Sequence, residues 1–82
     1  MEILKENIAE VITHIRETKG HSQRELAEMA GISNTMLNDI ERKRVNPSLK
    51  TLQKIADALN MKVSQIFLQA EYGRSVNGKK GE

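Results

Sequence analysis

The 82-residue sequence contains no cysteine and no tryptophan, and its only aromatic residues are Phe67 and Tyr72. The absence of cysteine excludes disulfide bonds and thiolate metal sites, and it fits a cytoplasmic protein. No apolar run approaches the length of about 18 residues that indicates a membrane span. The first residues also lack the apolar stretch of a secretory signal. Because aromatic residues are so few, we expect a core of aliphatic side chains.

The chain length predicts one small domain. Apolar residues make up 38% of the sequence and charged residues 29%, which is typical of a folded chain and not of a disordered one. A domain of this size buries only about 60% of the surface of its unfolded chain. A pocket that encloses a substrate would therefore leave little core, so the size favours a binding module over an enzyme.

The net charge of +2 is unevenly distributed along the chain. Residues 21–41 carry a net charge of −3, whereas residues 42–50 carry +4 and no acid. Surface potential follows local charge, so this basic cluster suits an anionic partner. The alternative interpretation is a solvated helix end, since cations near a helix C-terminus also complement the helix dipole.

Apolar residues recur at the i, i+3, i+4, i+7 spacing of a helical face, and no segment shows a strand pattern. We expect a serine to cap each of the four later helices and a glycine to end each of the first two. Residues 73–82, rich in Gly, Ser and Lys, are expected to form a flexible tail after a domain at 1–72. Counted with their caps, the five predicted helices cover about residues 4–19, 22–30, 33–42, 48–59 and 64–70.

The third predicted helix, about 33–42, has a distinctive polar side. Leu37 and Ile40 form its apolar side, which leaves Asn34, Thr35 and Asn38 on the outer side. Amides and hydroxyls both donate and accept hydrogen bonds, so these side chains suit the edges of bases, and Asn can pair bidentately with adenine. The alternative is that they are ordinary surface residues.

The sequence resembles the helix-turn-helix family of phage repressors, Cro proteins and Xre-type bacterial regulators. The resemblance extends over about residues 8–68, with small, glycine and aliphatic positions at fixed offsets across four helices. The matching residues are Gln23-Arg24-Glu25-Leu26-Ala27, Gly31-Ile32-Ser33, Leu37, Ile40-Glu41, Pro47-Ser48-Leu49, Leu52, Ile55-Ala56 and Leu59.

The resemblance implies a compact, all-α, five-helix domain. Its third helix would enter the major groove of DNA while the second crosses the backbone above it. By position, Asn34, Thr35 and Asn38 match base-contacting residues. Gln23 also matches a residue that braces its neighbour on the third helix. The implied phosphate contacts are Gln23, Ser33, Arg42, Lys43 and Arg44.

Three positions depart from the family pattern or leave two interpretations open. The family usually has glycine where this chain has Lys43, so either Lys43 adopts a positive φ or the helix ends differently. Met36 replaces a frequent aromatic residue and either fills the core or contacts a thymine methyl group. Asp39 either accepts from a cytosine amine, repels phosphate or pairs with Arg42, and we favour the pairing.

These observations together predict a sequence-specific transcriptional regulator, a repressor in our interpretation, that binds double-stranded DNA as a homodimer. Two recognition helices about 34 Å apart would contact successive major grooves of a pseudo-palindrome. The alternative is an antitoxin-like or adaptor module that uses the same fold to bind a protein. The fifth helix carries more apolar residues than it can bury alone. The expected dimer residues are Val63, Ile66, Phe67, Leu68 and Tyr72.

We expect neither a cofactor nor catalysis. His14 and His21 stand alone, with no carboxylate or thiol at metal-ligand spacing, so no metal site is predicted. Glu25 is not a candidate catalytic residue, because it already serves as the partner of Ser22 in a capping box. The adjacent His21 and Ser22 lack a third group to orient them, so they do not form a catalytic triad.

Overall fold

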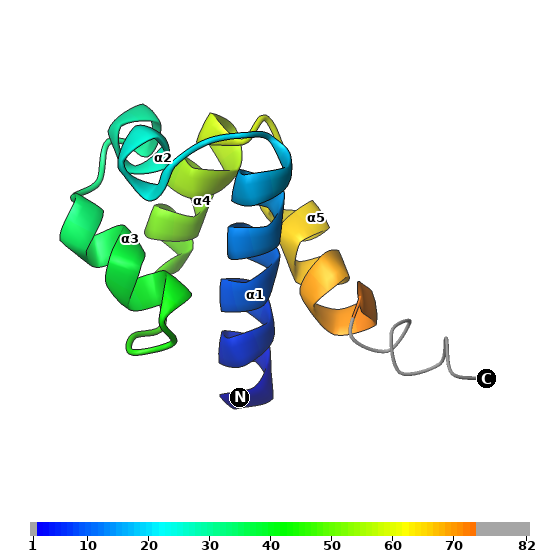
Figure 1. Cartoon of the computed structure of the whole chain (residues 1–82). Helices are drawn as coiled ribbons and strands as arrows, with labels where there is room; N and C mark the ends of the chain where they lie inside the picture. The colour runs from blue at the N-terminus through cyan, green and yellow to red at the C-terminus, as the bar shows by residue number, and fades with distance from the viewer. Residues whose placement is uncertain (1, 74–82) are drawn as a thin grey trace.

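The computed structural model describes residues 2–73, and it describes side chains over residues 8–71. Within residues 2–73 every regular element is helical, which confirms the predicted all-α class with five α-helices. Over the same range no helix is both long and apolar enough to cross a membrane. The elements are α1 (Glu2–Thr18), α2 (Gln23–Ala30), α3 (Asn34–Glu41), α4 (Leu49–Ala58), α5 (Val63–Leu68) and the π-helical turn η1 (Gln69–Gly73) (Figure 1).

The core is aliphatic, as the composition predicts. α1 contacts α3, α5 and η1, while α2 contacts α3 and α4. Figure 1 shows α3 and α5 on opposite sides of the molecule, with α4 and α1 between them. The arrangement therefore leaves one side of α3 and one side of α5 without a neighbouring helix. The largest fully buried side chains are Ile12, Leu26, Leu37, Ile40, Ile55, Leu59 and Ile66.

Each of the first four helices is followed by one residue in the left-handed conformation. Gly20 and Gly31 have φ values of 81° and 73°, and the non-glycine residues Lys43 and Asn60 have values of 67° and 61°. Two backbone hydrogen bonds close each turn, as in the Schellman motif. Lys43 thus adopts the positive φ that was one of our two alternatives, and it takes the place of the glycine usual in the family.

Three of the four predicted serine caps are confirmed. The hydroxyls of Ser22, Ser33 and Ser48 accept the backbone N–H three residues later at 3.0, 3.0 and 3.1 Å. The prediction for Ser64 is wrong, because α5 begins one residue earlier at Val63. There the side chain of Gln65 accepts from the backbone N–H of Lys62 at 2.9 Å instead.

The fifth helix continues directly into η1. Ala70, on this turn, is fully buried, and η1 contacts α1. Gly73, which we expected to begin the tail, ends η1. The rest of the predicted tail, 74–82, lies outside the described residues. The last described turn is therefore part of the folded domain.

Candidate nucleic-acid interface

Local hydrogen bonds define the start of α2 and the turn that leads into α3. Ser22 and Glu25 form the predicted capping box, with bonds of 3.0 and 2.9 Å. Gly31 ends α2, and the N–H of Ile32 donates to the carbonyl of Ala27 at 3.0 Å. Ser33, two residues after Gly31, then caps the start of α3. The connection is too short for the helices to lie side by side, so α3 leaves α2 at a sharp turn.

The outer side of α3 carries the predicted base-contacting residues. Leu37 and Ile40, on the inner side of α3, are buried. Asn34 and Thr35 are exposed, and Asn38 is half-buried. Amide and hydroxyl groups therefore occupy the side of α3 that faces away from the core, where their spare donors and acceptors are available to a partner.

Met36 also lies on this outer side, with 43% of its surface exposed. Of our two interpretations for Met36, the core-filling one is therefore wrong. The contact with a thymine methyl group stays a prediction. Ser33, at the start of the same helix, is exposed as well.

A polar network connects α1, α2 and α3 behind this surface. The guanidinium of Arg16 donates to both carboxylate oxygens of Glu41, with Nε–Oε2 at 2.8 Å and Nη2–Oε1 at 3.1 Å. Nε2 of Gln23 donates to Oε1 of Glu41 at 3.0 Å. Nδ2 of Asn38 in turn donates to Oε1 of Gln23 at 3.2 Å. Gln23 thus braces Asn38, as the family resemblance implied.

The ion pair of this network is largely shielded from water. The side chain of Glu41 is 4% exposed and that of Arg16 12%. Arg16 also donates to the backbone carbonyl of His21 at 2.8 Å, which ties α1 to the start of α2. A buried charge needs both a partner and further hydrogen bonds, and this arrangement supplies both.

Sequence reasoning gave no role to Arg16 or Glu41. Their separation of 25 residues hides the pairing from any local pattern. The available signal was an arginine directly after Ile15 on the apolar side of α1 and a glutamate directly after Ile40 on α3. A charged residue at the edge of an apolar stripe is usually a solvated one, so this signal alone predicts no partner.

The three basic residues of the loop after α3 differ in whether they form an ion pair. Nζ of Lys43 lies 3.0 Å from Oε2 of Glu10 on α1, and Nη1 of Arg44 lies 3.6 Å from Oδ1 of Asp39. The predicted pairing of Asp39 with Arg42 is therefore wrong, because the Schellman turn carries Arg44 back over Asp39. Arg42 is exposed, and it forms no ion pair with any residue in the described part of the chain.

The predicted dimer residues fall into three groups. Ile66 is fully buried in the core of its own chain, so its assignment to a dimer surface is wrong. Val63 and Phe67 are half-buried and pack against the core, whereas Leu68 is 51% exposed. The side chain of Tyr72 lies outside the described residues. Only part of the predicted surface is therefore available to a second copy.

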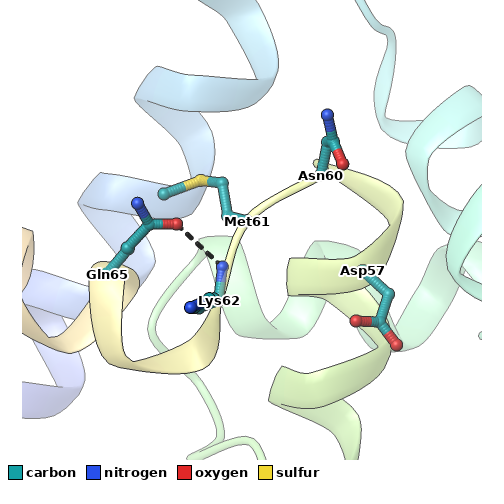
Figure 2. Close-up of a pocket in the computed structure, with 5 residues that line it drawn as sticks. All are labelled: Asp57, Asn60, Met61, Lys62 and Gln65. Carbon is teal, nitrogen blue, oxygen red and sulfur yellow. Dashed lines mark hydrogen bonds between the residues drawn. The ribbon is translucent and has the colours of Figure 1, made fainter.

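A further surface feature lies away from α3. The turn between α4 and α5 forms a shallow pocket lined by Asp57, Asn60, Met61, Lys62 and Gln65 (Figure 2). Its one marked hydrogen bond is the helix cap of Gln65 on the N–H of Lys62. Among the described residues, no group of three His, Cys, Asp or Glu side chains is placed to hold a metal ion.

Comparison with known proteins identifies the family. The helix-turn-helix family model matches residues 12–66, which include α2, α3 and the polar network. The chain is 46% identical over 59 residues to the immunity repressor protein of Bacillus phage phi105, a match that covers 72% of this chain and 41% of that protein. It is 38% identical over 64 residues to control protein C.SmaI of Serratia marcescens, covering 78% and 76% of the two chains.

A solved structure agrees with the sequence matches. The clp gene regulator ClgR of Corynebacterium glutamicum superposes with a TM-score of 0.82 at 27% identity, covering 95% of this chain and 83% of the other. The chain belongs to the helix-turn-helix family, and this confirms the resemblance seen in its residues. It spans less than half the length of several curated relatives that it matches, including the phage repressor.

Proposed function

We propose that this protein is a transcriptional regulator that binds double-stranded DNA by inserting α3 into the major groove. The observation that carries the proposal is the outer side of α3, where Asn34 and Thr35 are exposed and Asn38 is half-buried, while the opposite side is buried. A helix of this kind fits the major groove, in which each base pair presents a distinct set of donors and acceptors. Relatives named as repressors and regulators support the same role.

Phosphate contacts would set the position of α3 on the duplex. Ser33 and Arg42, at the two ends of α3, are exposed, and Arg42 has no ion pair with any side chain of residues 8–71. Lys43 and Arg44 are paired with Glu10 and Asp39. We therefore propose Arg42 as the main cationic contact, with Ser33 and Gln23 as polar ones. Lys43 and Arg44 would contribute by exchanging a carboxylate for a phosphate.

We also propose that two copies bind a pseudo-palindromic operator. A single α3 contacts only a few base pairs, and a two-fold pair doubles the site. Figure 1 shows α5 across the molecule from α3. Pairing through α5 would therefore leave the two α3 helices at the outer ends, as binding to successive major grooves requires. Leu68, exposed on α5, would lie in that contact together with the exposed parts of Val63 and Phe67.

The test is selection of bound sequences from a random duplex library, followed by titration of the selected site at several salt concentrations. We expect a symmetric site with half-sites one helical turn apart and an affinity that falls as salt rises. Recovery of no preferred sequence, with equal affinity for all duplexes, would contradict the proposal. Recovery of an unpaired half-site would contradict the dimer alone.

A further inference from the structure

The polar network has a direction that follows from chemistry alone. A guanidinium has donors only and a carboxylate has acceptors only. Arg16 pairs with both oxygens of Glu41, and because this ionised carboxylate can only accept, Gln23 must turn its amide nitrogen toward it, at 3.0 Å. The amide oxygen of Gln23 then faces Asn38, which must offer its own nitrogen, at 3.2 Å. The acceptor-only carboxylate of Glu41 thus determines which end of each amide points where.

We infer that Glu41 is a specificity-determining positioning residue, which acts through Gln23 to hold the amide of Asn38 in one of its two orientations. This inference rests on the proposed function. Glu41 has 4% of its side chain exposed, so it acts on DNA through its neighbours. Its effect reaches the surface in two steps, because Gln23 donates a hydrogen bond to Glu41 and Asn38 donates one to Gln23. Each bond fixes the orientation of the amide that donates it.

The orientation of Asn38 matters because an amide is asymmetric. In the orientation observed, one N–H of Nδ2 is used by Gln23, which leaves the second N–H and the oxygen Oδ1 for a base. This pair of groups matches N7 and N6 of adenine. In the reversed orientation the donor and acceptor would exchange places, and the same side chain would match a different base edge. Glu41 excludes the reversed orientation by excluding the reversed Gln23.

The energetic consequence is modest and measurable. Reversing Asn38 in the wild type costs the bond to Gln23 and leaves two acceptors face to face. A neutral hydrogen bond contributes about 0.5–1.5 kcal/mol net, equivalent to a factor of about 2–10 in an equilibrium constant. We therefore expect discrimination at the base contacted by Asn38 to fall about 2- to 10-fold when the network loses its direction.

The experiment compares three variants on the selected operator and on its single-base variants at the position read by Asn38. Glu41→Gln places an amide, with a donor, where the carboxylate was and so frees Gln23 to reverse. Arg16→Lys keeps a cation beside Glu41, and with it the ionised, acceptor-only carboxylate, but loses the two-point contact of the guanidinium. Gln23→Met removes the brace while leaving the ion pair of Arg16 and Glu41 intact. Thermal unfolding followed by circular dichroism establishes that each variant is folded at the assay temperature.

The readout is the ratio of dissociation constants for the operator and its single-base variants, which is independent of overall affinity. We expect Glu41→Gln and Gln23→Met to lower this ratio about 2- to 10-fold and Arg16→Lys to leave it unchanged. If Glu41→Gln and Gln23→Met keep the wild-type ratio, or if Arg16→Lys lowers it equally, the inference is overturned while the proposed function stands. A wild-type protein that prefers no sequence would overturn both.

Discussion

At the scale of single residues, the side chains of the candidate interface differ in how firmly neighbouring groups hold them. Asn38 is braced by Gln23, whereas Asn34 and Thr35 are exposed. A side chain already held in its bound orientation loses less conformational entropy on association. We therefore expect Asn38 to contribute more to sequence choice than its two exposed neighbours on α3.

The first prediction concerns Asn38→Ala. The variant should lower discrimination between operator and random duplex by about 1–3 kcal/mol, because it removes a bidentate base contact. Nonspecific binding should be retained, since phosphate contacts supply it. Fluorescence anisotropy titrations with both duplexes measure the difference. An equal loss on both duplexes would remove Asn38 from the base-contacting set.

The second prediction separates Arg42 from Lys43. Arg42→Ala should weaken binding to all sequences and reduce the slope of log affinity against log salt by about 1, because one phosphate contact is lost. Lys43→Ala should reduce the slope less, since Lys43 already pairs with Glu10 at 3.0 Å. Titrations over a range of salt concentrations give both slopes. Equal slopes for the two variants would show that Lys43 contributes as much to phosphate binding as Arg42 does.

At the scale of elements, α3 is a helix of eight residues and is too short to be stable in isolation. Its position depends on Leu37 and Ile40 in the core, on the cap at Ser33 and on the Schellman turn at Lys43. The turn has a second consequence, because it directs Arg44 back over Asp39. The geometry of one helix end therefore decides which cation of the basic loop is unpaired.

The third prediction tests the assignment of helix caps. Ser33→Ala should lower the free energy of unfolding by about 1 kcal/mol, because the N–H of Met36 loses its acceptor. Ser64→Ala is the matched control: Ser64 is exposed inside α5, not at its start, and alanine has the higher helix propensity. It should be neutral or slightly stabilising. Urea unfolding of both variants checks this, and a loss at Ser64 comparable to that at Ser33 would restore Ser64 as a cap.

At the scale of the whole molecule, α3 and the exposed part of α5 lie on opposite sides of one small core (Figure 1). The polar network joins α1, α2 and α3 through Arg16, Gln23 and Glu41. Binding of DNA and pairing of two copies would therefore use separate surfaces. A variant at α5 can weaken pairing without touching the residues proposed to contact DNA.

The fourth prediction uses this separation. Leu68→Glu should shift the protein from dimer to monomer in sedimentation equilibrium, because a two-fold contact meets the new charge twice. Met29→Glu, an equally exposed apolar position on α2 (49% against 51%), should leave the assembly state unchanged. Ile66 is unsuitable for this test because its replacement would open a cavity in the core. A dimer that persists in Leu68→Glu would exclude α5 as the contact.

The family, the five helices and three of the four serine caps were predictable from local patterns. Apolar spacing defines which side of each helix is buried, and serine and glycine mark helix ends by conformational preference. The same spacing placed Asn34, Thr35 and Asn38 on the outer side of α3. Position 43 was recognised as exceptional for the same local reason, since a positive φ is unusual for lysine.

The start of α5 and the burial of Ile66 were harder to predict from the sequence. Ser64 has the side chain of a cap, but the residue that precedes α5 is Lys62, two residues earlier, and its backbone N–H donates to the side chain of Gln65. Ile66 belongs to an apolar cluster, and sequence alone does not divide such a cluster between a chain's own core and its outer surface. That division depends on how closely α5 approaches α1 and α4.

The sequence by itself thus determined which segments are helical, which side of α3 is polar and to which family the chain belongs, because these properties arise from neighbouring residues. Only the tertiary structure decided the partners of Glu41, Lys43 and Asp39. The partners of Glu41 and Lys43 lie on other helices, so those pairings depend on the angles at which the helices cross, whereas the partner of Asp39 is set by the turn after α3. The direction of the network behind Asn38 is therefore a property of the assembled core.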